Sequence, residues 1–509
     1  MRLSKRFAFL LASGLALLTV FICWSVSSPL GSAPDDAFHA AQIWCSQGME
    51  SEYCKIISVN GDRLTVEVPR ISPDCFWNPS LSSASCVNES ANRLPQQVSF
   101  GESDYPGGTY KVLSFFVSSN PVSSLLQMRV FNGVLATVIA IGLLILADSK
   151  KRLAFAAMWI SVLNPHGLFF ISSINPTGWS FLSVSTSWLF LLMLLETRWI
   201  SKAEKIRGAT ISIFFLTTLL IGVFSRWDTW VFLFATYVVS VVIANIQRQW
   251  FKLSHLAIVA SCVFLMALLI AQFNPKMGYF LALNPLQNQT GLGFGQYLLY
   301  ISIHLIEFPI GVFGSDWGWG GLGGLYPSTP PVVGIVGLSV ATAIVIFATR
   351  RINTIQVISS MFIVLLILGA TFQQQNVGRF FVGDMVAPRY LMGLVAVLVA
   401  VLVLTSKSDE QFYDVKHFRI GALVALTITH SIALYSNLDR FISFGLGSTG
   451  YFKGLSQVGG WWWDTSISPY FVWALGSLSF LLFMITTLQF CRLNVDEIDI
   501  NSRSFTPQI

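Results

Sequence analysis

The feature that most constrains the fold of this chain is a series of apolar segments that reach the ~20 residues a bilayer-spanning helix needs. Only 11% of the 509 residues are charged, whereas a soluble domain carries about 25%. The sequence therefore predicts an all-α polytopic membrane protein. We predict twelve transmembrane helices, near residues 7–28, 125–147, 153–172, 177–196, 208–224, 230–246, 254–272, 332–348, 356–372, 388–405, 419–436 and 470–489.

The gaps between the predicted spans differ in charge. Lys and Arg are dense in the first tail and in the gaps on one side of the predicted bilayer, namely MRLSKR, DSKKR, TRWISKAEKIRG, IQRQWFK, TRRIN and SKSDEQFYDVKHFR. Short loops rich in Lys and Arg remain in the cytoplasm. We therefore expect a multi-pass protein of the cell (plasma) membrane with cytoplasmic N- and C-termini. Because these basic groups act as topology signals, they do not indicate a nucleic-acid partner.

These expectations divide the chain into six parts. They are a first transmembrane helix (1–28), an extracytoplasmic loop domain (29–124), transmembrane helices 2–7 (125–272), an outer loop with an interfacial helix (273–331), transmembrane helices 8–12 (332–489) and a cytoplasmic tail (490–509). The alternative interpretation of the first part is a signal peptide, since SPLGSAP has a weak cleavage-like pattern. Its apolar core is longer than the usual ~7–15 residues, which favours a retained anchor.

The first outer loop is predicted to be a small folded element. KIISVNGDRLTVEV alternates apolar and polar residues around Asn60-Gly61, which predicts a β-hairpin. An even cluster of cysteines in an outer loop indicates disulfides in an oxidising compartment. Four cysteines lie in this loop and can pair in three ways. Short loops close most easily, so we expect Cys45–Cys54 and Cys75–Cys86. The alternative is that these cysteines bind a metal ion, but the loop has no Cys/His spacing typical of a metal site.

A second outer region is predicted to run from about Asn274 to Pro331. We predict a helix lying in the membrane interface for FGQYLLYISIHLIEF. We predict a tight loop, with its tryptophans in the headgroup zone, for GSDWGWGGLGGLYPSTPP. NPHGLFFISSINPTGWS contains two Asn-Pro steps that suggest the rim of a cavity. We assign to this rim His166, Asn175, Trp317 and Trp319; for His166 and Asn175 the alternative role is a structural polar contact.

The segment PDDAFH places two carboxylates and a histidine directly after the first span. Asp35 and Asp36 follow Pro34, a residue that suits the first turn of a helix, and carboxylates there favour the positive end of the helix dipole. One interpretation is therefore an N-terminal cap on an outer helix. The second is an exposed face that Asp35 and Asp36 share with His39. Such a face can bind a metal, orient an acceptor hydroxyl or act as a general base.

Three further charged residues lie near the predicted outer surface. Arg389, in PRYLMG, lies where a polar gap enters the tenth span. It either snorkels to the interface or binds phosphate, whose geometry a guanidinium matches. Arg226 and Asp228, in SRWDTW, lie in a very short gap, and we expect them to pair with each other.

Four motifs, in their order along the chain, resemble those of the bacterial membrane proteins of domain of unknown function 2142 (DUF2142). PDDAFH resembles the family's Pro-Asp-Glu-x-x-His pattern, with Asp36 in place of Glu. INPTGW resembles its Asn-Pro-Asp step, with Thr177 in place of the acid. GWGGLGGLYPSTPP resembles Gly-Trp-Leu-Asp-x-x-x-Pro without the acid, and APRYLMG resembles Gly-Arg-Tyr-x-x-Pro with Arg389 and Tyr390 kept.

Members of this family are similar to type C glycosyltransferases (GT-C). The resemblance implies a GT-C-like membrane fold that transfers a sugar from a polyprenyl-phosphate donor to an extracytoplasmic cell-envelope glycan. Asp35 matches the family's first acid and is the first candidate for the catalytic base, with Asp36 and His39 beside it. Arg389, Tyr390 and Arg226 are then the candidates for binding the donor phosphate. Polyprenyl phosphate is already a good leaving group, so a divalent cation is optional and no cofactor is required.

Two other classes of function stay open. A transporter or flippase of lipid-linked or small solutes tends to carry internal repeats and ionisable groups at mid-membrane, whereas this chain shows no repeat and its spans are nearly free of charge at their centres. A non-catalytic envelope assembly protein is the third class, because two of the family's acids are missing. The chain contains no glycine-rich phosphate loop, HExxH or GxSxG motif.

Overall fold

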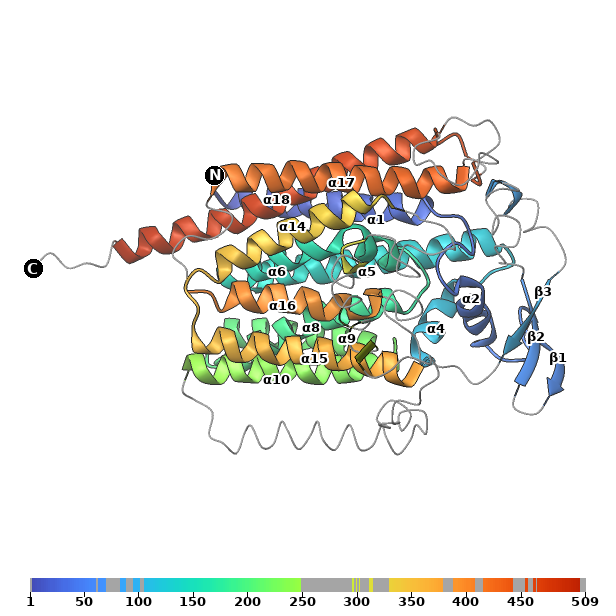
Figure 1. Ribbon diagram of the computed structural model, residues 1–509, viewed down its shortest axis with the longest axis horizontal. Helices are drawn as coiled ribbons and strands as arrows, with labels where there is room; N and C mark the ends of the chain where they lie inside the picture. The colour runs from blue at the N-terminus through green and yellow to red at the C-terminus, as the bar shows by residue number, and fades with distance from the viewer. Residues whose placement is uncertain are drawn as a thin grey trace, which may run out of the picture.

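The computed structural model describes residues 2–60, 63–69, 83–87, 95–100, 105–248, 295–296, 299, 302, 311–314, 329–378, 388–407, 415–442, 454–455, 461–463 and 465–503. Within these residues the chain is mostly helical (Figure 1). The longer helices are α1 (Arg2–Val26), α2 (Asp36–Cys45), α5 (Pro121–Leu146), α6 (Ser149–Val162), α8 (Thr177–Glu196), α9 (Lys202–Val223), α10 (Trp227–Arg248), α14 (Pro331–Ala348), α15 (Thr354–Gly378), α16 (Met392–Leu404), α17 (Lys416–Ile442) and α18 (Pro469–Arg503). The short helical turns are α4 (Gly108–Leu113), η2 (Ser114–Phe116), η3 (Leu163–Gly167), α7 (Leu168–Ile171) and η5 (Pro388–Leu391).

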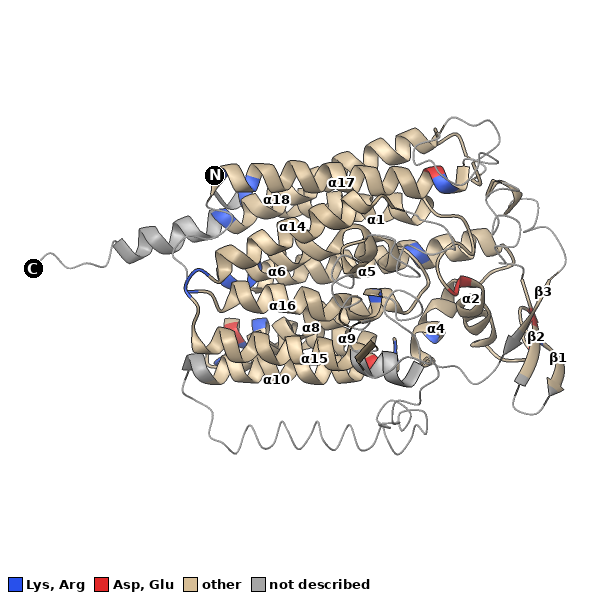
Figure 2. Ribbon diagram, in the orientation of Figure 1, with Lys and Arg blue, Asp and Glu red and all other residues tan. Residues whose placement is uncertain are grey.

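The long helices run side by side and form one bundle (Figure 1). At one end lie α2, α4 and a small sheet, and we call this the loop end. At the opposite end α1 begins and Lys and Arg gather (Figure 2). We call this the basic end and define it by Arg6, Lys151, Arg152 and Arg207.

Among the described residues, ten helices are long and apolar enough to cross a bilayer. They are Lys5–Val26, Pro121–Leu146, Ser149–Ile171, Thr177–Glu196, Lys202–Val223, Trp227–Asn245, Pro331–Ala348, Thr354–Thr371, Lys416–Ile442 and Pro469–Arg492. Ten of the twelve predicted spans match them. The predicted span near 388–405 is a shorter apolar helix, Pro388–Leu404, and the one near 254–272 lies outside the described residues. The protein is therefore a multi-pass membrane protein in contact with the lipid bilayer.

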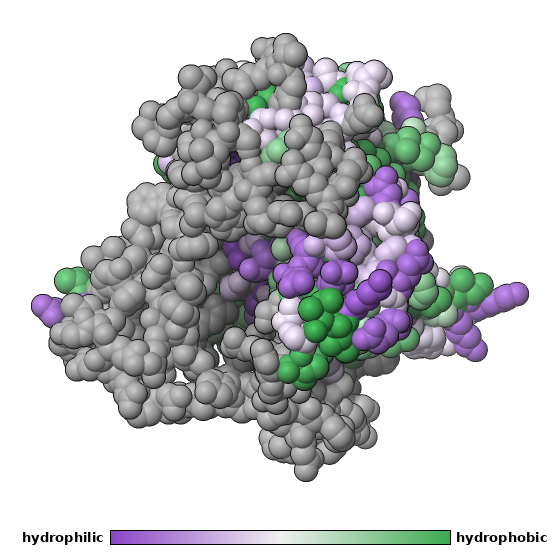
Figure 3. Space-filling view, turned by 90° about the vertical axis from the view of Figure 1, so that its right-hand side faces the viewer, coloured by the Kyte–Doolittle hydropathy of each residue, from purple (hydrophilic) through white to green (hydrophobic). Residues whose placement is uncertain are grey.

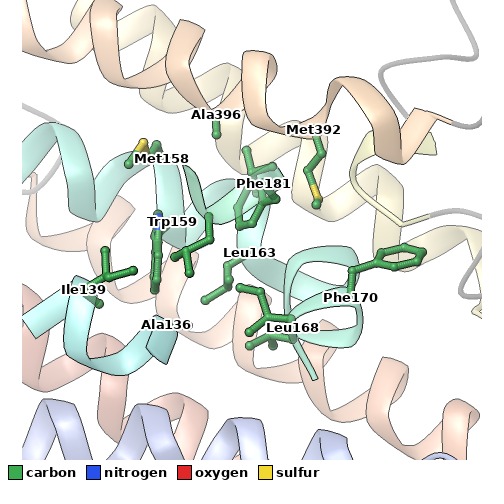
Figure 4. Close-up of a cluster of buried hydrophobic side chains, with 14 of the residues drawn as sticks. Ala136, Ile139, Met158, Trp159, Leu163, Leu168, Phe170, Phe181, Met392 and Ala396 are labelled. Carbon is green, nitrogen blue, oxygen red and sulfur yellow. The ribbon is translucent and has the colours of Figure 1, made fainter. Parts of the chain in front are cut away.

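The core lies around α6 and α8, which other helices enclose almost completely. Figure 4 shows Trp159 of α6 between Ile139 of α5 and Leu163, with Phe181 of α8 and Ala396 of α16 nearby. Small residues let helices approach closely in a membrane, where packing rather than hydrophobic burial drives association. In α6 these include the buried residues Ala154, Ala156 and Ala157, and α6 packs along α16.

The loop end carries a three-stranded antiparallel sheet in the order β1 (Lys55–Asn60), β2 (Arg63–Val68) and β3 (Gln96–Phe100). The predicted hairpin is confirmed, since Lys55 pairs with Glu67 and Asn60 pairs with Arg63. The third strand was not predicted. It joins β2 through pairs such as Val66 with Val98.

One of the two expected disulfides is confirmed. Cys45 at the end of α2 bonds Cys54, with a Cα–Cα distance of 5.1 Å, and so ties α2 to the strand that follows. Cys86 is also disulfide-bonded. Its predicted partner, Cys75, lies outside the described residues, so that pairing stays a prediction. Cys23 and Cys491 are free and buried.

Candidate active site at the loop end

Asp35 is the residue that joins the turn after α1 to the start of α2. Its backbone is in the left-handed region, with φ 61° and ψ 15°, a conformation that Asp tolerates better than most residues. The side chain is exposed and makes no capping hydrogen bond to α2. The carboxylate of Asp36 instead accepts a hydrogen bond from the Ala33 N–H at 3.1 Å. A simple cap therefore does not account for the Asp35 side chain.

The expectation of an exposed carboxylate–histidine face is wrong for two of its three members. Asp36 is 1% exposed and His39 is 0% exposed. The physical reason is that α2 packs against α4, whose Tyr110 covers the His39 ring at a centroid distance of 5.9 Å. Of the three residues, Asp35 alone presents its side chain to the outside.

His39 is enclosed by aromatic rings. Its Nδ1 is hydrogen-bonded to the Tyr110 hydroxyl at 2.9 Å, and its ring lies 5.0 Å from Tyr105 and 5.6 Å from Phe38. Burial, together with the positive charges of Arg226 and Arg389, lowers the pKa of His39 to about 3. His39 is therefore a neutral imidazole at neutral pH, and a weak base.

Arg226 occupies the short turn between α9 and α10. It forms a two-point ion pair with Asp228, with Nε–Oδ1 at 3.0 Å and Nη2–Oδ2 at 2.8 Å, which confirms the predicted pair. Its guanidinium also lies over the Tyr390 ring at 4.0 Å and the Tyr105 ring at 5.6 Å. Its Nη1 atom is buried and has no hydrogen-bond partner among the described residues.

Arg389 approaches the same ring from η5, at the start of α16. It is 8% exposed. Its Nη2 donates to the Tyr390 hydroxyl at 3.3 Å, and its guanidinium lies 4.9 Å from the Tyr390 ring and 5.4 Å from that of Phe170. Simple snorkelling leaves a charged head in water, whereas Arg389 is buried. Tyr390 therefore has a guanidinium from each of two distant segments close to it.

Tyr105 links Asp35 to this cluster. Burial raises the pKa of Tyr105 to about 12, with Arg226 opposing the rise and the negative charges of Asp35 and Asp228 adding to it. Asp35 thus acts electrostatically on a ring that also lies under Arg226. The structure brings together residues from α2, the segment before α4, the α9–α10 turn and η5.

The predicted rim residues have different positions. Asn175 donates from Nδ2 to the Pro34 carbonyl at 2.9 Å, so it holds the residue before Asp35. His166 is buried, and its Nδ1 is hydrogen-bonded to the Val312 carbonyl at 3.2 Å. Trp317 and Trp319 lie outside the described residues. Both described residues make structural polar contacts.

The surface of the loop end is mixed in character. Figure 3 views this end and shows hydrophilic side chains gathered in the middle of the described surface, next to a small hydrophobic patch. Within the described residues, no group of three or more His, Cys, Asp or Glu side chains is placed to hold a metal ion. The arrangement offers one exposed carboxylate that acts electrostatically on two tyrosines, and two guanidiniums that lie over one of these rings.

Sequence reasoning missed Arg129, Tyr105 and Tyr110. The sequence contained a signal for Arg129, because an ionisable residue inside a predicted span is a candidate for a functional role. The sequence contained no such signal for the two tyrosines, since their role depends on the packing of α2 against α4.

These features define a multi-pass membrane protein with an acid–guanidinium–tyrosine cluster at one end of its helical bundle. The profile of the family described as "Predicted membrane protein (DUF2142)" matches residues 18–398, and the chain belongs to this family. No curated protein and no solved structure matches the chain.

Proposed function

We propose that this protein is a GT-C-like membrane glycosyltransferase that moves a sugar from a polyprenyl-phosphate donor to an extracytoplasmic cell-envelope glycan. The observation that carries the proposal is the exposed carboxylate of Asp35, whose negative charge acts on Tyr390, a ring contacted by the guanidiniums of Arg226 and Arg389. A lipid-linked sugar has its tail in the bilayer and its sugar at headgroup level. The cluster lies at one end of the spans, where that reacting bond would lie.

The two arginines lie in different surroundings. Asp228 neutralises Arg226 through two hydrogen bonds, so Arg226 offers an N–H group rather than a net charge. Arg389 contacts the Tyr390 hydroxyl and two aromatic rings. We assign Arg389, Arg226 and the Tyr390 hydroxyl together as the donors to the donor phosphate. Guanidinium groups aimed at the leaving phosphate stabilise the charge that develops there.

Asp35 is the proposed general base. Its carboxylate accepts the proton of the acceptor hydroxyl while the acceptor oxygen bonds to the anomeric carbon. The bond from that carbon to the phosphate oxygen breaks, and the polyprenyl phosphate leaves with the electron pair. Asp35 is held at a helix start, which supplies orientation. Buried Asp36 and the neutral His39 support the site rather than accept this proton.

Two observations support an outward orientation of the loop end. Lys and Arg gather at the opposite, basic end (Figure 2), which favours a cytoplasmic position for that end and both termini in the plasma membrane. The Cys45–Cys54 disulfide lies at the loop end, and disulfides persist in oxidising compartments. A divalent cation beside Asp35 is an optional addition.

The test is transfer by the full-length protein in lipid nanodiscs. The protein is incubated with radiolabelled polyprenyl-phosphate sugars and purified envelope glycan, and label is followed from the lipid into the glycan. We expect label in the glycan and free polyprenyl phosphate in equal amounts. Label that stays on the lipid with every donor and acceptor would contradict the proposal. In vesicles, movement of labelled lipid between leaflets without transfer would favour a flippase.

A further inference from the structure

Arg129 of α5 is a buried arginine that the reaction outlined above does not use. It is 1% exposed and lies at the loop end of a membrane span. Its Nη1 donates to the carbonyls of Ser25 at 3.2 Å and Ser28 at 2.6 Å. Its Nη2 donates to the Pro29 carbonyl at 2.9 Å and to Asp36 Oδ2 at 3.4 Å.

All four acceptors of Arg129 belong to the end of α1 and the connection from it to α2. The arginine therefore fixes both ends of that connection, since Ser25 lies within α1 and Asp36 begins α2. Asp36 Oδ2 also accepts from the Ala33 N–H. A planar guanidinium can reach several acceptors at once, which the single ammonium of lysine does less well.

Asp35 lies between two fixed points of this connection. On one side the Pro34 carbonyl accepts from Asn175, and on the other the Asp36 carboxylate is held by Arg129. Asp35 itself has a left-handed backbone. Such a conformation in a residue other than glycine persists where its surroundings determine it, and it is frequent at active sites.

We infer that Arg129 is a positioning residue, which through Asp36 and three backbone carbonyls holds Asp35 in the orientation that catalysis needs. This inference rests on the proposed transferase function. Arg129 touches neither donor nor acceptor in this role. Asp36, which the sequence suggested as a catalytic group, becomes the partner through which Arg129 acts.

The experiment compares Arg129→Lys, Asp36→Asn and the double variant Arg129→Gln/Asp36→Asn with wild type in nanodiscs. The double variant leaves no uncompensated buried charge, so it stays informative if a single variant unfolds. The matched control is Lys151→Gln, which breaks the ion pair that buried Lys151 makes with partly buried Glu196 at the basic end. Hydrogen exchange of the amides in residues 27–36 is measured first, and transfer kinetics second.

We expect exchange in residues 27–36 to rise at least about tenfold in the three variants, since the hydrogen bonds that close this connection are lost. Displacing a reacting group by about 1 Å costs about a hundredfold in rate, so kcat should fall by up to about a hundredfold while KM for the donor stays within about twofold. Lys151→Gln should change neither quantity when normalised to folded protein.

The outcomes separate this inference from the proposed function. Unchanged exchange in residues 27–36 in Arg129→Lys and in the double variant would overturn the positioning role whatever the activity. Faster exchange with an unchanged kcat would overturn it too, as would an equal fall of kcat in Lys151→Gln. If wild type transfers no sugar while amide exchange in residues 27–36 is still faster in the variants, the proposed transferase function is wrong. The conclusion that Arg129 fixes residues 27–36 is then retained.

Discussion

The two ends of the helical bundle use charged residues in different ways. At the basic end, charged side chains either donate hydrogen bonds to the last carbonyls of a helix or pair with each other. Lys151 bridges Asp148 and Glu196, while Arg152 and Arg207 donate to the last carbonyls of α5, those of Ile145 and Leu146. At the loop end, Arg226 and Asp228 also pair, but the Asp35 carboxylate is exposed and makes no hydrogen bond among the described residues.

This difference shows how to separate structural from functional charges at a membrane edge. Cations near the C-terminal end of a helix satisfy carbonyls and the helix dipole, so the arginines of the basic end have a sufficient structural explanation. Asp35 lies at a helix start, where its charge also favours the helix dipole, but it makes no capping hydrogen bond. Its left-handed backbone adds a cost of about 1–3 kcal/mol, which nothing in local capping offsets.

The largest expected effect is on transfer in Asp35→Asn. A general base contributes about 10²–10⁴-fold in rate, so kcat should fall by about that factor while membrane insertion and thermal stability stay unchanged. The measurement is label transfer per folded protein. The matched control is Glu50→Gln, another exposed acid of the first outer loop, which should transfer as wild type does. Full activity in Asp35→Asn would remove the functional contrast between the two ends.

The next effect concerns the pH dependence of stability in Asp36→Asn. Burial raises the pKa of Asp36 to about 6 from its ordinary 3.8, although Arg129 opposes the rise. Between these values the folded state binds more protons than the unfolded state, so stability from this group is greatest below pH 3.8 and declines as pH rises to about 6.

At about 1.4 kcal/mol per pKa unit, the stability of wild type relative to Asp36→Asn should decrease by up to about 3 kcal/mol across this window. Thermal unfolding in detergent at several pH values measures it. A relative stability that increases with pH would mean that Arg129 outweighs burial, and that the pair behaves as an ordinary salt bridge.

A comparable effect is expected on donor binding in Arg389→Ala. A hydrogen bond to a charged group contributes about 1.5–3 kcal/mol, so the Kd for a polyprenyl-phosphate sugar should rise about tenfold to a hundredfold. The matched control is Arg350→Ala, since Arg350 also lies over an aromatic ring, that of Phe347 at 4.3 Å, at the basic end. Equal losses in the two variants would mean that Arg389 only anchors η5.

The smallest effect should appear in Lys151→Gln and should affect stability alone. Lys151 is buried, but Asp148 is about half exposed, so the uncompensated acids regain part of their hydration. We expect a loss of about 1–2 kcal/mol in the free energy of unfolding, below the ~3–5 kcal/mol of a fully buried pair. Chemical denaturation in detergent measures it. A fall in kcat per folded protein would show that the basic end also contributes to function.

Local patterns in the sequence predicted those parts of the fold that depend on local physics. Apolar run length gave ten matching spans, alternation around Asn60 gave the β1–β2 hairpin, and short separation gave Cys45–Cys54. The Arg226–Asp228 pair was equally local. The third strand, β3, was missed because its pairing with β2 spans a long connection.

The candidate site was predicted in part, because its burial depends on contacts between distant segments. The exposure of His39 could not be derived from its neighbours, since Tyr105 and Tyr110 cover it from more than sixty residues along the chain. In the same way, Arg129 reaches Asp36 only because α5 lies beside α1. Residue types and order predicted which groups carry the chemistry, and tertiary packing decided which of them face outward.

The most direct measurement is a cryo-EM structure of the full chain in nanodiscs with a non-hydrolysable polyprenyl-phosphonate sugar. The account predicts the phosphonate at the guanidinium of Arg389 and the sugar beside Asp35, close enough for an acceptor hydroxyl at ~3 Å from the carboxylate to reach the anomeric carbon. A donor analogue bound at another face of the bundle, with Asp35 and Arg389 both remote from it, would contradict the account.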